Sequence, residues 1–60
     1  MKKGKIENGK KVWYYPIYGG DERREAIITG GPYKIGGTVC CNIDIITSVV
    51  AIDNLKERNN

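Results

Sequence analysis

The sequence predicts a small all-β protein, and two stretches of the chain carry this prediction. From Thr38 to Ile45, apolar and polar residues alternate, which gives a β-strand one apolar and one polar face. The stretch from Ser48 to Ile52 is mostly apolar and β-branched, a composition typical of a strand. A hairpin of these two stretches is marginal alone, so the rest of the chain is expected to cover its apolar face with further strands.

The size and composition of the chain limit how it can be stabilised. It has 60 residues, 40% of them hydrophobic, and a net charge of +3. A domain of this size buries only about 60% of the surface that its unfolded chain exposes. Stability must therefore come from a compact sheet, from oligomerisation or from both. Two cysteines and no histidine provide no conventional structural metal site, and we expect neither a metal nor a cofactor.

The two cysteines are neighbours in the sequence. On a strand their side chains point to opposite faces, so a disulfide between them would distort the backbone. We expect Cys41 to be a small core residue and Cys40 to be a free surface thiol. Free thiols suit a reducing compartment. Because we also find neither a signal peptide nor a transmembrane segment, we expect a cytoplasmic protein without membrane contact.

Residues 1–10 are expected to form a basic, partly flexible segment. Two interpretations of its charge stay open: a solvated terminus that keeps the protein soluble, or a weak, non-specific contact with nucleic acid or another polyanion. The residues of the second interpretation are Lys2, Lys3, Lys5, Lys10 and Lys11. Since Asn8-Gly9 is a strong turn signal, a short strand from Lys5 to Glu7 is a further alternative.

The first predicted strand covers residues 11–15 and ends at a proline, which lacks a backbone N–H. Val12 and Tyr14 share one of its faces, and Trp13 and Tyr15 share the other. Either pair can face the core, because Trp13 is the largest apolar side chain in the chain. With Val12 and Tyr14 inside, the other two rings form an exposed aromatic surface, a feature that often marks a binding site.

A charged loop is expected over residues 17–24, with a helix beginning at Asp21 as the alternative. Three contiguous apolar residues and a glycine-proline stop favour instead a short strand from Glu25 to Thr29. The glycine-rich residues 30–37 are expected to form a two-part turn.

The turn of the C-terminal hairpin is poorly marked, and it is placed either at residues 45–47 or at residues 42–44. In either case the pair Ile45 and Ile46 is hard to bury in one monomer, which suggests a dimer contact. After the last strand of the hairpin, Asp53 can cap one short helical turn that returns Leu55 as a plug on the open end of the sheet.

Several short motifs, in this order, resemble those of small stand-alone SH3-like barrel proteins of bacteria and phages, most of which are uncharacterised. They are Gly9-x-x-Val12, Tyr14-x-Pro16, Ala26-Ile27-Ile28 and Val50-Ala51-Ile52-Asp53-Asn54-Leu55. The resemblance covers residues 10–57. It implies a five-stranded, partly open barrel over residues 11–57 with one short 3-10 turn near the C-terminus, followed by frayed residues 58–60.

In SH3-like barrels the long first loop and the short helical turn flank a partner-binding groove. By this resemblance the binding residues are Trp13, Tyr15, Tyr18, Arg23 and Arg24. The chain lacks the aromatic-Asp-Tyr cluster of eukaryotic peptide-binding SH3 domains and the glycine pattern of ribosomal KOW modules. Neither proline-rich ligands nor ribosomal RNA is therefore specifically implied. We expect a non-catalytic module that binds an unknown protein or nucleic acid.

Two other classes of function stay open. The first is a structural subunit that forms a homo-oligomer through its exposed isoleucines. The second is an oligomeric enzyme with a shared pore, because the plasmid-encoded dihydrofolate reductase is a small SH3-like barrel that works only as a tetramer. The chain shares a Ser-Val-Val-Ala-Ile segment (residues 48–52) with that enzyme but lacks its Val-Gln-Ile-Tyr motif. Without a histidine or a nucleophile–base pair, we do not expect catalysis.

Overall fold

The computed structural model describes residues 2–59 and shows the predicted all-β fold. Five antiparallel strands form one sheet in the order β4-β3-β2-β1-β5. The strands are β1 (Lys11–Tyr14), β2 (Arg24–Ile35), β3 (Thr38–Ile43), β4 (Ile46–Ala51) and β5 (Leu55–Glu57), and the two 3-10 turns are η1 (Lys3–Lys5) and η2 (Ile52–Asn54). Within residues 2–59 no helix has the length and apolarity needed to cross a bilayer.

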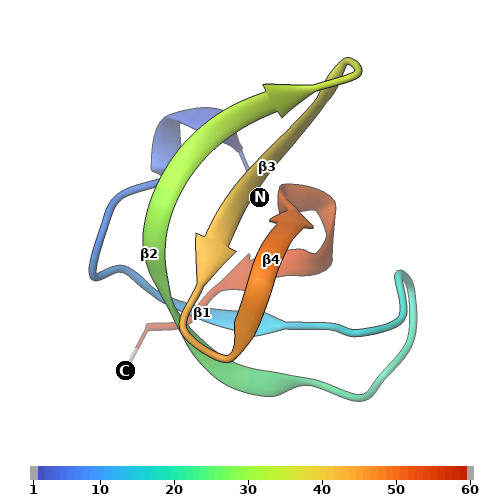
Figure 1. Cartoon of the computed structure of the whole chain (residues 1–60). Coiled ribbons are helices and arrows are strands. Elements are labelled where there is room, and N and C mark those ends of the chain that lie inside the picture. The colour runs from blue at the N-terminus through green and yellow to red at the C-terminus, as the bar shows by residue number, and fades with distance from the viewer. Residues whose placement is uncertain (1, 60) are drawn as a thin grey trace.

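Strand β2 is the long, bent strand that joins the two halves of the sheet (Figure 1). Its first residues pair with β1, and from Ile28 onward it pairs with β3. The register with β3 shifts between Ile28 and Gly30 and again between Gly30 and Tyr33. Such irregularities bend a strand and increase its local twist, so β2 curves around the core and contributes to both halves.

The expected short strand and long glycine-rich turn are both wrong in extent. β2 continues to Ile35 through the stretch expected to be a turn, and the connection to β3 contains just Gly36 and Gly37. Both of these glycines have positive φ, at 56° and 83°, a conformation that glycine adopts without steric cost. The bulges of β2 accommodate the earlier glycines and the cis Gly31–Pro32 bond within the strand.

The turn between β3 and β4 lies at Asp44 and Ile45, so it overlaps each of the two expected positions by one residue. Asp44 explains this placement through two contacts with the neighbouring strand. Its backbone N–H donates to the carbonyl oxygen of Ile27 at 3.0 Å, and its Oδ1 accepts from the N–H of Ile27 at 2.9 Å. The turn is therefore fixed to β2 by contacts that are distant in sequence.

The core lies between the two halves of the bent sheet. Its buried residues are Ile6, Val12, Ala26, Ile28, Cys41, Ile43, Val50, Ile52 and Leu55. Buried pairs face each other across the strands, including Ile28 opposite Ile43 and Cys41 opposite Val50. In β1, Val12 is fully buried and Tyr14 packs against the core. This confirms the interpretation in which Trp13 lies on the outer face.

The N-terminal segment is part of this fold rather than a separate extension. Ile6 is buried in the core, and the N–H of Gly9 donates to the carbonyl oxygen of Ile28 at 2.8 Å. The N–H of Ile28 in turn donates to Lys10 at 3.0 Å. The alternative strand at residues 5–7 is wrong, because η1 occupies residues 3–5 and no strand precedes β1 in the described chain. Met1 lies outside the described residues.

The C-terminal end agrees with the prediction in its main feature. η2 follows β4, and Leu55 is 1% exposed, as expected for the plug. Asp53 is not the cap: Ala51 takes that position without a side-chain hydrogen bond, and Asp53 lies in the first turn. The fraying of residues 58–60 stays a prediction, although the N–H of Arg58 donates to the carbonyl oxygen of Lys11 at 3.2 Å. The last residue, Asn60, lies outside the described part.

The expected contrast between the cysteines is wrong, since both are buried. Cys41 belongs to the core cluster, whereas Cys40 lies on the opposite face and is 8% exposed. Cys40 lies between Tyr33 on β2 and Ala51 on β4, and directly opposed residues in antiparallel strands share a face. Burial raises the pKa of the Cys41 thiol, and the neighbouring Cys40 raises it further.

We expect both thiols to react slowly with a disulfide reagent in the native protein, and at the rate of free thiols in denaturant. Burial blocks access to both, and the raised pKa of Cys41 lowers the fraction of reactive thiolate at a given pH. Colorimetric titration of the released thiol, with and without urea, measures this. One thiol equivalent released rapidly from the native protein would show that the outer face at Cys40 is open.

Candidate functional site

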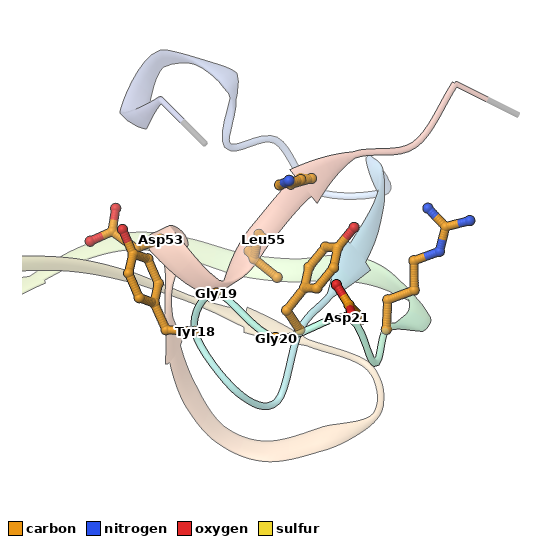
Figure 2. Close-up of a pocket in the computed structure, with 9 residues that line it drawn as sticks. Tyr18, Gly19, Gly20, Asp21, Asp53 and Leu55 are labelled. Atoms are coloured by element: carbon orange, nitrogen blue, oxygen red, sulfur yellow. The ribbon is translucent and has the colours of Figure 1, made fainter.

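A pocket of about 740 Å³ lies between the first loop (residues 15–23) and the segment formed by η2 and β5. We call it the loop–turn pocket. Its lining residues are Tyr15, Tyr18, Gly19, Gly20, Asp21 and Arg23 from the loop, with Asp53, Leu55 and Lys56 from the facing segment. Figure 2 shows Tyr18 and Asp53 together at one end and Asp21 toward the other. The pocket therefore joins two segments that are far apart in the sequence.

Two hydrogen bonds between Tyr15 and Asn54 fix the first loop against η2. The N–H of Tyr15 donates to the carbonyl oxygen of Asn54 at 2.8 Å, and Nδ2 of Asn54 donates to the carbonyl oxygen of Tyr15 at 2.9 Å. Farther along the loop, the N–H of Gly20 donates to Ile17 at 2.9 Å and closes a tight turn. Gly19 lies in this turn with a φ of 79°. The two bonds between Tyr15 and Asn54 hold the walls of the pocket together without using the side chains that line it.

The charges in the pocket are mixed and lie beside its aromatic rings. Lys56 Nζ lies 5.2 Å from the centre of the Tyr15 ring, and the Arg23 guanidinium carbon lies 4.0 Å from the centre of the Trp13 ring. A cation at such a distance is attracted by the negative face of the ring. The side chains of Asp21 and Asp53 add two carboxylates. The pocket thus presents donors, acceptors and aromatic surface within one hollow.

Three of the five predicted binding residues line this pocket: Tyr15, Tyr18 and Arg23. Tyr18 is 75% exposed, so its ring is available to a partner. Arg24 does not line this pocket. It pairs with Glu22 at 2.9 Å and lines a second pocket, of about 570 Å³, between the first loop and the β3–β4 turn.

Trp13 lies next to the loop–turn pocket without lining it. Its ring is half-buried under two arginines, with the guanidinium carbon of Arg58 at 5.6 Å in addition to that of Arg23. Arg58 is itself held by Glu25 at 3.3 Å and by the carbonyl oxygen of Ala26 at 3.0 Å. The aromatic surface expected from the sequence is therefore partly covered by the protein's own cations.

Replacing Arg23 with alanine is expected to make Trp13 more accessible, because the guanidinium group covers one side of the ring. Acrylamide quenching of Trp13, the only tryptophan, should become stronger in the variant, and the native emission should move to longer wavelength. Arg24→Ala is the matched control, since Arg24 pairs with Glu22 and not with Trp13. Equal quenching in the wild type and in Arg23→Ala would contradict the stacked geometry.

The predicted nucleic-acid lysines lie outside the loop–turn pocket. Lys10 Nζ forms an ion pair with Glu57 Oε1 at 3.0 Å, and this contact lowers the pKa of Glu57. Lys2, Lys5 and Lys11 are exposed, and the side chain of Lys3 lies outside the described part of the structure. The positive charge of the N-terminal segment is therefore partly neutralised and separated from the pocket.

Sequence reasoning missed Asp53 and Lys56 as pocket residues. Asp53 lies in the 3-10 turn η2, and Lys56 lies in β5 directly after Leu55.

The two isoleucines of the predicted dimer contact differ in their exposure. Ile45 is 43% exposed, whereas Ile46 is half-buried against the core.

The chain matches no protein-family model, no curated protein and no solved structure.

Proposed function

We propose that the protein is a non-catalytic binding module that takes a short extended segment of another protein into the loop–turn pocket. The observation that carries this proposal is the meeting of Tyr15, Tyr18 and Arg23 with Asp53 and Lys56 in one hollow. Tyrosine offers flat apolar area together with a hydroxyl group. Aromatic residues and arginine contribute a large share of the binding energy in many protein interfaces.

The charge of the pocket favours a peptide over a nucleic acid. A phosphate backbone entering the pocket would meet the carboxylates of Asp21 and Asp53 beside the two cations. A peptide carries amide donors and carbonyl acceptors and can pair side chains of either sign with the same lining. Contact of nucleic acid with the exposed lysines of the N-terminal segment would be non-specific and strongly weakened by salt.

We make two further proposals, one on the fold family of the protein and one on its location in the cell. We place the chain among the small SH3-like barrel proteins of the kind found in bacteria and phages. The five-stranded sheet, the long first loop and the 3-10 turn before β5 support this. We also propose a cytoplasmic location, which is supported by the unpaired cysteines Cys40 and Cys41.

Selection from a library of random peptides, followed by NMR titration of the labelled protein, tests the binding proposal. The largest chemical-shift changes are expected at Tyr15, Tyr18 and Asp53. Tyr18→Ala should weaken the selected peptide by about tenfold, or about 1.4 kcal/mol. The matched control is Ile17→Ala, because Ile17 is the adjacent residue and is 66% exposed but does not line the pocket.

Three outcomes would contradict the proposal. They are a library that yields no binder, a binder that Tyr18→Ala does not weaken, and shift changes confined to another surface. A titration with a single-stranded oligonucleotide at low and high salt serves as the competing arm. Binding that persists at high salt and is lost in Tyr18→Ala would assign the pocket to nucleic acid instead.

A further inference from the structure

The outer face of β1 and β5 gathers aromatic rings and cations. The residues of β1 that point away from the core alternate with the buried Val12. Directly opposed residues of antiparallel strands point to the same side, and Lys56 of β5 lies opposite Trp13. Arg23, which precedes β2, stacks on the Trp13 ring. We call this surface the aromatic–basic face, and its residues are Lys11, Trp13, Tyr15, Arg23, Lys56 and Arg58.

This face carries the net charge of the protein. It has four cations and one nearby carboxylate, that of Glu25, which lies opposite Trp13 on β2 and pairs with Arg58. Four positive charges and one negative charge give +3, which equals the net charge of the whole chain, so the charges of all other residues cancel. Asp21 and Asp53 in the adjoining loop–turn pocket limit the positive surface on that side. An anionic partner is therefore attracted to this face in preference to the rest of the surface.

Three of the four cations are available to a ligand. Lys11, Arg23 and Lys56 are exposed, and none of them forms an ion pair with a carboxylate of residues 2–59. Arg58, in contrast, is held by Glu25 and by a backbone carbonyl, and its side chain is 11% exposed. Arg58 therefore contributes to the positive potential, whereas the other three cations can contact an anion directly.

The aromatic rings suit this face to flat bases as well as to charge. Trp13 and Tyr15 are half-buried, with the Arg23 guanidinium carbon 4.0 Å from the centre of the Trp13 ring and Lys56 Nζ 5.2 Å from the centre of the Tyr15 ring. The unstacked bases of single strands stack on aromatic rings and on guanidinium planes, and lysines follow the phosphate backbone. An exposed guanidinium that is supported by a ring can extend the stack to a base.

We propose that the aromatic–basic face binds single-stranded nucleic acid, a ligand additional to the peptide of the loop–turn pocket. A base stacks on the exposed side of the Arg23 guanidinium, and the adjacent phosphates lie against Lys11 and Lys56. A duplex hides the faces of its bases, so it gains the charge contacts alone. An acidic peptide likewise offers charge without a flat ring at each repeat. Rings and unpaired cations on one face therefore favour a single strand.

Fluorescence anisotropy of a labelled single-stranded oligonucleotide of about 12 nucleotides tests this inference, since small single-strand-binding barrels cover roughly 4–16 nucleotides. The triple variant Lys11→Gln, Arg23→Gln, Lys56→Gln should raise the dissociation constant at least about tenfold at low salt. The slope of its logarithmic salt dependence should fall by about 2, because three phosphate contacts are lost.

The matched control is the triple variant Lys2→Gln, Lys5→Gln, Lys34→Gln. It removes the same charge from exposed lysines outside the face and should change the dissociation constant by less than about threefold. Far-UV circular dichroism checks that both triple variants fold. An equal loss of affinity in the two variants would show that binding depends on total charge and would overturn the proposal.

Two further readouts do not depend on the triple variants. The bound oligonucleotide should protect Trp13, the only tryptophan, from quenching by acrylamide. Tyr18→Ala, which is expected to weaken the peptide of the loop–turn pocket, should leave the affinity for the oligonucleotide unchanged. Failure of the peptide proposal and failure of this one are thus distinguishable.

Several results of these measurements would contradict the proposal. They are a wild type that does not bind the oligonucleotide at low salt, unchanged quenching of Trp13 at saturation, and affinity lost in Tyr18→Ala. A duplex of the same length that binds as tightly as the single strand at high salt would show that stacking contributes nothing. Polyglutamate that binds as tightly as the oligonucleotide would assign the face to acidic proteins instead.

Discussion

Replacing Leu55 with alanine is expected to lower the free energy of unfolding by about 2–5 kcal/mol, the range for buried leucines whose removal leaves a cavity. Leu55 is 1% exposed and begins the strand that completes the sheet beside β1. Small domains have only about 5–15 kcal/mol of total stability, so this change removes a large part of it. Urea denaturation followed by the fluorescence of Trp13 measures the loss.

The matched control for this change is Ile17→Ala, which removes aliphatic carbon from a side chain that is 66% exposed. Substitutions at such positions change the stability by about 0.5 kcal/mol or less. A Leu55→Ala variant as stable as the control would show that Leu55 is not packed in solution. Because Leu55 also lines the loop–turn pocket, its loss should weaken peptide binding even where the variant remains folded.

Replacing Gly31 with alanine is expected to destabilise the protein by about 3 kcal/mol, through backbone strain and overpacking together. Gly31 has a φ of 104°, a conformation that L side chains rarely adopt. An added Cβ would lie 2.9 Å from Cβ and 3.0 Å from Cα of Cys41. Cys41 is fully buried in a central strand, so it has no free space into which to move.

Gly37→Ala separates the two causes of this loss. Gly37 also has positive φ, at 83°, but nothing lies within 4 Å of an added Cβ. This variant should therefore show the conformational cost alone, about 1–2 kcal/mol. Thermal and urea denaturation of both variants measure the difference. Equal losses would contradict the close approach of Gly31 to Cys41.

The sequence predicts the parts of the fold that depend on local pattern. Alternation identifies β3 and its inward residues Cys41 and Ile43, and it offers the correct pair, Val12 and Tyr14, as one of two inward faces of β1. Other features depend on partners that a local pattern does not reveal. Ile6 is an isolated apolar residue among lysines. It becomes part of the core because backbone hydrogen bonds of Gly9 and Lys10 with Ile28 bring that segment onto β2.

Glycine and proline misled the prediction for β2 because both residues usually mark turns. In this chain they occupy register shifts within a strand, where glycine and proline are also accommodated. The predicted position of the hairpin turn is inexact for a related reason. Asp44 is fixed by two hydrogen bonds to Ile27, and no property of residues 42–47 alone reports that distant contact.

The candidate site was likewise predictable only in part. Tyr15, Tyr18 and Arg23 could be selected because the long first loop is visible in the sequence. The resemblance also places the short helical turn beside the groove, but which of its side chains line the pocket depends on the three-dimensional position of η2 and β5, so Asp53 and Lys56 are not among the predicted binding residues. Trp13 lies on the outer face, one of the two alternatives that the sequence leaves open. Its covering by Arg23 and Arg58 depends in part on a C-terminal residue that the sequence predicts to be frayed.

The position of β1 between β2 and β5 has a consequence for the order of folding. β2, β3 and β4 are each adjacent in sequence to a strand with which they pair, whereas β5 must find β1 near the opposite end of the chain. The entropy of closing that long loop must be overcome before the pairing contributes any stability. The meander of β2, β3 and β4 is thus expected to form early and β5 to dock late. We expect local opening of the native protein to follow the reverse path, in which the wall of the loop–turn pocket made by β5 detaches while the meander is still intact. A peptide bound as proposed should slow that opening.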